Sequence, residues 1–143
     1  MSSEANKKEA LLKSITGRGG EDAACAFLVD QGYVIIHRNY RIGHKEIDII
    51  AENDKYIVFV EVKTRTVRSG ESRYGRPSAA VDAAKRRALA SAASGYIKSH
   101  KSDKFYRFDV VEVVIRSDGI SGEGRYEINH MKGVFGARGR IWI

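Results

Sequence analysis

The sequence contains very little cysteine and no long apolar stretch. Its single cysteine, Cys25, excludes an internal disulfide. No run approaches the roughly 20 apolar residues that span a bilayer, and residues 1–8 lack the apolar core of a secretory signal. These absences lead us to expect a cytoplasmic protein with no membrane partner.

Two common kinds of site are also missing. The four histidines show no His-x-x-x-His spacing, and there is no Cys-x-x-Cys pair, which argues against a zinc site. The glycine-rich segment 17–20 does not follow a predicted strand, so it is not a nucleotide-binding phosphate loop. Cys25 lies among apolar residues of a helical pattern, which favours a packing role over nucleophilic catalysis.

Positive charge is in excess. The 143 residues include 25 Lys and Arg against 18 Asp and Glu, which gives a net charge of +7 and favours polyanionic partners such as nucleic acid. A chain of this length suits one domain. We expect a mobile arm over residues 1–15, a single domain over 16–135 and a tail over 136–143.

The hydrophobic pattern predicts the order α-β-β-β-α-β, with a weak strand appended. It indicates helices over 18–31 and 77–98, strands over 33–37, 45–51, 55–63 and 105–115, and a short edge strand over 125–129. Asn53-Asp54 is the turn between the second and third strands, and the third strand is apolar on both faces, as a central strand is. We therefore predict an α/β fold, a three-layer sandwich with a central mixed sheet flanked by helices.

Charged residues interrupt two of these apolar strands. Glu46 and Asp48 share a face of the second strand, and Glu61 and Lys63 share a face of the third, because residues two apart in a strand point the same way. Desolvating a charge is costly, so such groups must be paired, neutralised or bound to metal. Pairing of the two strands would bring Asp48 close to Glu61.

A divalent cation would relieve the repulsion between these two acids. Asp48, Glu61 and the Val62 carbonyl offer only oxygen ligands, which favours Mg²⁺ or Mn²⁺. Lys63 could then orient an attacking water or offset charge that builds on the phosphate. The spacing thus predicts a metal-dependent phosphodiesterase site. The alternative is that Glu61 pairs with Lys63 or with Arg65 at the strand end.

Further candidate residues lie on the helices and after the third strand. Glu21 should face inward from the first helix, where it either coordinates metal or water or complements the helix dipole. On the second helix, Lys85 either snorkels to solvent or reaches a scissile phosphate. The polar segment after the third strand is either a solvated loop or a phosphate-contacting one. We expect nucleic-acid contacts from Arg65, Arg68, Arg73, Tyr74, Arg76 and Lys85.

An internal salt bridge is the simplest explanation of Arg107 and Asp109, which share a strand face. Several segments resemble the uncharacterised bacterial YraN-like proteins: Thr16 to Ala24, Gly32-Tyr33, Arg38 to Arg41, Glu46 to Ile50, Phe59 to Arg65, Lys85, Arg107 to Val111 and Asn129 to Phe135. Lys45 departs from the glycine that this family usually has before Glu-Ile-Asp.

The YraN-like family is similar to the PD-(D/E)XK nuclease superfamily, with a restriction endonuclease-like fold and a motif order close to that of Holliday-junction resolvases. The resemblance implies Asp48 and Glu61 as metal ligands, Lys63 as the catalytic lysine and Glu21 as the acid of the first helix. We therefore expect a Mg²⁺-dependent endonuclease acting on structured or branched DNA.

Two other functions fit the same residues. One is a nucleic-acid-binding module that keeps the fold without cutting. The other is a structural or assembly protein whose ionic cluster fixes strand register. A symmetric junction would suit a two-fold homodimer, so a second copy of the chain is also considered as a partner.

Overall fold

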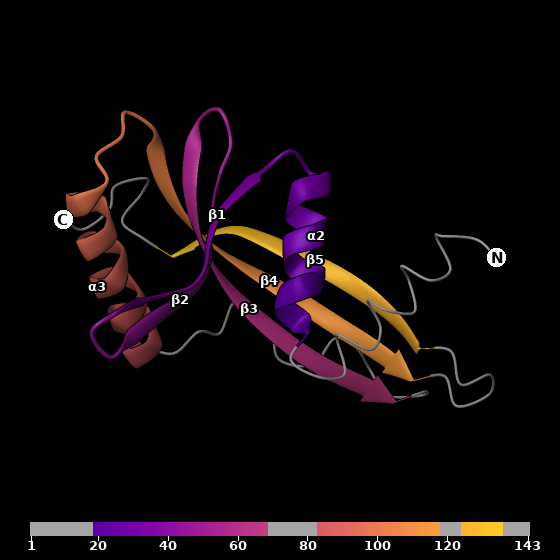
Figure 1. Ribbon diagram of the computed structural model, residues 1–143. Helices are drawn as coiled ribbons and strands as arrows, with labels where there is room; N and C mark the ends of the chain where they lie inside the picture. Colours follow the sequence, from indigo (N-terminus) through magenta and orange to yellow (C-terminus); the bar gives the residue numbers. More distant parts are fainter. Residues whose placement is uncertain (1–18, 69–82, 118–123, 136–143) are drawn as a thin grey trace.

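The computed structural model describes residues 19–68, 83–117 and 124–135, which form two helices and five strands (Figure 1). In chain order these are α2 (Gly20–Asp30), β1 (Val34–Ile42), β2 (Lys45–Glu52), β3 (Tyr56–Arg68), α3 (Ala83–Ser99), β4 (Phe105–Ser117) and β5 (Gly124–Phe135). Neither of the helices in these ranges is long and apolar enough to cross a membrane.

The strands form one mixed sheet in the order β1-β2-β3-β4-β5. All neighbouring strands are antiparallel except β3 and β4, which run parallel along their whole length. A parallel pair needs a crossover connection, and α3 lies in the segment that joins these two strands. The predicted α/β sandwich with a mixed sheet is therefore confirmed.

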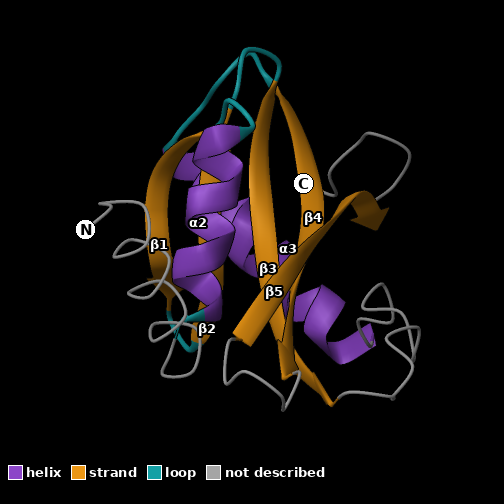
Figure 2. Ribbon diagram, turned by 90° about the vertical axis from the view of Figure 1, so that its right-hand side faces the viewer, coloured by secondary structure: helices purple, strands orange, loops and turns teal. Residues whose placement is uncertain are grey.

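The two helices cover opposite faces of the sheet (Figure 2). Val58 and Val60 of β3 pack with residues of α2, while Ile57 and Phe59 pack with residues of α3. Both faces of β3 are thus buried, as the sequence predicts for a central strand. The two apolar cores fix α2 and α3 relative to the strands between them.

Several strands are longer than predicted. β1 continues to Ile42 instead of ending at His37, and β5 continues to Phe135. β3 continues to Arg68, so the prediction that Arg65 and Arg68 lie in a loop is wrong. Each extension is paired with a neighbouring strand, which satisfies backbone groups in segments whose polar side chains are typical of loops. The predicted helix start at Pro77 lies outside the described residues.

Two local turn predictions are confirmed. Gly32, which follows α2, has φ +97°, the left-handed conformation that glycine adopts without strain. Asn53 accepts hydrogen bonds through Oδ1 from the backbone N–H groups of Lys55 and Tyr56, at 3.0 and 2.8 Å. This side chain closes the turn that leads from β2 into β3.

Candidate functional site

The two predicted acids meet where β2 and β3 separate. Pairing of these strands ends at Ile49 and Val60, so Asp48 and Glu61 occupy the next position on each strand. There the Asp48 carboxylate accepts a hydrogen bond from the Val62 N–H, with 2.8 Å between Oδ2 and N. The Asp48 side chain thus takes the place of the next backbone hydrogen bond between β2 and β3. We call this point, with Asp48 and Glu61, the fork.

The fork coincides with a distortion of β1 and β2. Ile47 packs on the α3 side of the sheet and Ile49 on the α2 side, although residues two apart in a regular strand face the same way. The reversal falls at Asp48. On β1, Asn39 lies opposite Asp48, between the paired residues Arg38 and Tyr40. Its φ of 51° is in the left-handed region. Asparagine tolerates this conformation better than most residues.

Glu61 is a buried acid with one anionic and one cationic neighbour. The Asp48 carboxylate lies near enough to act on its charge, and the Nζ of Lys85 on α3 lies 3.3 Å from its Oε2. Burial raises the pKa of Glu61 and the Asp48 charge raises it further, to about 7, although Lys85 lowers it. When both acids are ionised, the fork carries more negative charge than Lys85 alone neutralises.

Glu21 approaches the fork from the α2 side. Burial, followed by the Asp48 charge, raises its pKa, while Arg38 and Asn39 act to lower it. Its Oε1 is buried and has no hydrogen-bond partner among the described residues. The helix comes this close because Gly20 lies against Thr64 of β3, where a Cβ would overlap the threonine hydroxyl.

The donors at the fork fit a hard divalent cation. Mg²⁺ takes one or two carboxylates and keeps several waters, and Asp48 and Glu61 are two adjacent carboxylates with excess negative charge. In the described ranges no three His, Cys, Asp or Glu side chains gather closely enough to hold an ion by themselves. Asp48 and Glu61 would therefore hold the cation together with water and the Val62 carbonyl. The unpartnered Oε1 of Glu21 is suited to bind water nearby.

Lys63 lies next after Glu61 on the same face of β3, two residues along the strand. Its ammonium makes no hydrogen bond or ion pair within the part of the chain that the structure describes. Arg65 lies with its Nε 3.6 Å from Glu112 Oε2 on β4. The alternative pairing of Glu61 with Lys63 or Arg65 is therefore wrong, because the ion-pair partner of Glu61 is Lys85.

The predicted nucleic-acid contacts are only partly within the described structure. Arg68 ends β3, while Arg73, Tyr74 and Arg76 lie outside the described residues. On α3, Lys85 is followed by the exposed residues Arg86 and Arg87. The first described turn of α3 contains no acidic residue. Exposed cations on one helix suit contact with a polyanion.

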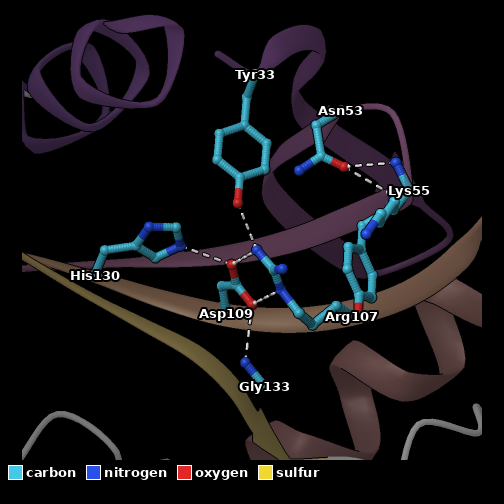
Figure 3. A network of polar contacts seen from close by, with 8 residues as sticks. Tyr33, Asn53, Lys55, Arg107, Asp109, His130 and Gly133 are labelled. Atoms are coloured by element: carbon cyan, nitrogen blue, oxygen red, sulfur yellow. Dashed lines mark hydrogen bonds and ion pairs between the residues drawn. The ribbon is translucent and has the colours of Figure 1, made fainter. Parts of the chain in front are cut away.

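Another buried acid, Asp109, is satisfied by the protein itself (Figure 3). Arg107 donates two hydrogen bonds to it at 2.8 Å, the Gly133 N–H donates one at 3.0 Å, and His130 Nε2 lies 2.6 Å away. Burial acts to raise the pKa of Asp109, but these hydrogen bonds hold it below its ordinary value. The predicted bridge between Arg107 and Asp109 is confirmed, and it joins strands rather than forming a reactive site.

Sequence reasoning missed two residues that build the fork. Asn39 was assigned no role, although an asparagine inside a strand-like segment is a signal for unusual backbone. Gly20 was treated as part of a glycine-rich segment, without the close contact to Thr64. The pairing of Lys85 with Glu61 also had no sequence signal, because it depends on where α3 packs.

Comparison with known proteins places these features in a family. Residues 20–113 match the model of "Uncharacterised protein family UPF0102". A UPF0102 protein of Bacteroides thetaiotaomicron is 40% identical over 119 residues, covering 83% of this chain and 90% of the relative. One from Symbiobacterium thermophilum is 51% identical over 104 residues, covering 72% and 85%. One from Chloroherpeton thalassium is 45% identical over 100 residues, covering 69% and 74%.

The matched range contains α2, the fork, α3 and most of β4. The chain therefore belongs to UPF0102, an uncharacterised family within the restriction endonuclease-like superfamily.

Proposed function

We propose that this protein is a divalent-metal-dependent hydrolase of phosphodiester bonds in DNA. The observation that carries the proposal is the fork, where Asp48 and Glu61 occupy neighbouring positions on β2 and β3 and Lys63 follows Glu61 on the same face of β3. A buried acid, Glu61, next to a half-buried one, Asp48, costs folding free energy unless positive charge compensates them. A cation site gives this costly arrangement a use.

Each residue of the fork then has a distinct role. Asp48 and Glu61 would hold Mg²⁺ or Mn²⁺, and the Val62 N–H fixes the Asp48 carboxylate in place. When bound, such an ion supplies Lewis-acid activation of the phosphate and of an attacking water. Lys63 places a positive charge beside the scissile phosphate, and Glu21 orients a water through its unpartnered Oε1.

The choice of DNA rests on charge and on resemblance. The net charge of +7 and the exposed cations Arg86 and Arg87 of α3 favour a phosphate backbone. A preference for structured or branched DNA comes from the motif order, which is similar to that of Holliday-junction resolvases. A homodimer and a cytoplasmic location stay predictions.

A cleavage assay tests the proposal. Labelled four-way junction, flap and single-stranded DNA are incubated with the protein and Mg²⁺ or Mn²⁺. We expect products from the wild type, and a loss of about 100-fold or more in Asp48→Asn and in Lys63→Ala, because each removes charge that acts on the reacting phosphate.

Glu127→Gln on β5 is the matched control, since it removes an acid whose partner is Arg116 rather than a group of the fork. This variant should cut at the wild-type rate. Equal cleavage by the wild type, Asp48→Asn and Lys63→Ala would show that the fork is not responsible, and no cleavage of any substrate would remove the catalytic claim.

A second candidate is a nucleic-acid-binding module that does not cut. It is favoured because protein groups already compensate both acids: Lys85 pairs with Glu61, and the Val62 N–H donates to Asp48. This candidate predicts binding without products. Log K should fall with log salt by about 0.9 for each phosphate neutralised. A flat salt dependence would contradict both candidates.

A further inference from the structure

Lys85 brings a positive charge to the fork from a separate element. Its Nζ lies 3.3 Å from Glu61 Oε2, and the Glu61 side chain is only 10% exposed while that of Lys85 is 48% exposed. The lysine therefore reaches from the surface of α3 to a buried carboxylate. From this position the Lys85 ammonium can exchange Glu61 for a negatively charged group in solution.

The packing of α3 lets the ammonium move while the helix stays in place. Leu89, one turn further along, is buried, as are Ala92 and Ala93 on the same helix. These residues hold α3 against the sheet. The flexible four-carbon stem of Lys85 can reorient without disturbing them. Toward solvent, its neighbours Arg86 and Arg87 are exposed, so a phosphate that binds there meets several cations.

The charges of the fork make the lysine and a divalent cation competitors. Asp48 and Glu61 carry up to two negative charges, and one ammonium supplies only one positive charge. An ion held by both carboxylates would supply two, and it would repel the ammonium that now lies against Glu61. A nucleic-acid phosphate offers the displaced ammonium a new partner.

We propose that Lys85 is a positioning residue that holds Glu61 while no cation is bound and passes to a phosphate of the nucleic acid when a divalent cation replaces it. This inference rests on the proposed function. It makes cation binding and nucleic-acid binding cooperative. A bound cation releases the Lys85 ammonium for a phosphate, and a bound phosphate draws that ammonium away from Glu61, where the cation binds. By linkage, the cooperativity must be equal in both directions.

Calorimetric titration with Mg²⁺ tests this exchange. All proteins carry Lys63→Ala, so that cleavage does not disturb the measurement. The pH is set to about 9, well above the Glu61 pKa of about 7, because loss of Lys85 would otherwise let a proton replace it. The titration is run without DNA and with a saturating four-way junction.

For the Lys63→Ala protein, we expect the junction to strengthen Mg²⁺ binding by roughly 5-fold or more. Adding Lys85→Met should strengthen Mg²⁺ binding without DNA and abolish the increase caused by the junction. Lys98→Met is the matched control: it removes an exposed lysine from the last turn of the same helix, away from Lys85, and should leave the increase intact.

The outcomes separate the two proposals. Mg²⁺ binding that Asp48→Asn abolishes but Lys85→Met leaves unchanged, with and without the junction, would overturn the exchange and leave the hydrolase proposal in place. No Mg²⁺ binding by any of these proteins would overturn both. Circular dichroism of Lys85→Met confirms that the variant is folded, which is expected because its side chain is half exposed.

Discussion

Glu61 is a single side chain that makes stability depend on pH. Its pKa is raised from 4.5 to about 7, first by burial and then by Asp48. The folded protein therefore binds more protons than the unfolded chain between these values. The stabilising contribution of protonated Glu61 is present in full below about pH 4.5 and is lost as the pH rises through about 7.

We expect Glu61→Gln to flatten this dependence. Without divalent ions, the wild type should lose unfolding free energy between about pH 5 and pH 8, by roughly 1 to 3 kcal/mol more than the variant does. Urea denaturation across this range measures the difference. Glu52→Gln, which removes an acid of β2 that pairs with Lys104, should keep the wild-type slope. Parallel curves for wild type and Glu61→Gln would contradict the shifted pKa.

The position of helix α2 depends on a small contact with β3. Gly20 lies directly against Thr64, and this approach brings Glu21 of α2 to the fork. A side chain at position 20 would push the helix away from the sheet. The glycine is thus required for close packing, whereas Gly32, at the other end of α2, is required for its positive φ.

Gly20→Ala should lower the unfolding free energy by about 1 to 3 kcal/mol, which is typical of overpacking. Thr64→Ala should restore part of this loss in the double variant, because the overlapping hydroxyl is gone while the Cβ of residue 64 still lies a tight 3.1 Å from the new methyl position. A double-mutant cycle by chemical denaturation measures the recovery. Additive losses in the two single variants would show that the helix does not press on Thr64.

Across the whole molecule, the network around Asp109 ties distant segments together. Arg107 and Asp109 belong to β4, His130 and Gly133 to β5, and Tyr33 to the connection between α2 and β1. The Tyr33 hydroxyl lies 2.7 Å from an Arg107 nitrogen. The side chains of Arg107 and Asp109 are 15% and 0% exposed, so neither can turn to water if its partner is lost.

Asp109→Asn should therefore cost about 3 to 5 kcal/mol of unfolding free energy, because it leaves the Arg107 guanidinium buried without a counter-charge. Asp22→Asn is the control, since its pair with Arg38 is more than 40% exposed on both sides and should be worth less than about 1 kcal/mol. Guanidinium denaturation compares the two. A loss at Asp109 as small as that at Asp22 would mean that the network does not hold β5 to the sheet.

The sequence by itself determined the two apolar faces of β3, the central place of this strand, and the turns at Gly32 and Asn53. It also determined that Asp48 and Glu61 share the space between two strands. These features follow from local periodicity and from turn chemistry, which depend only on neighbours along the chain. The resemblance in motif order led to the same family that the comparisons show.

Only the tertiary structure decided that Lys85, rather than Lys63 or Arg65, pairs with Glu61. It also decided that Asn39 distorts β1 beside Asp48, and that polar segments such as the end of β3 remain in the sheet. The physical reason is the same in each case. A charged side chain pairs with the group that packing brings within reach, and a strand continues wherever a neighbouring strand pairs with its backbone N–H and C=O groups. Both conditions depend on segments that are far apart in the sequence.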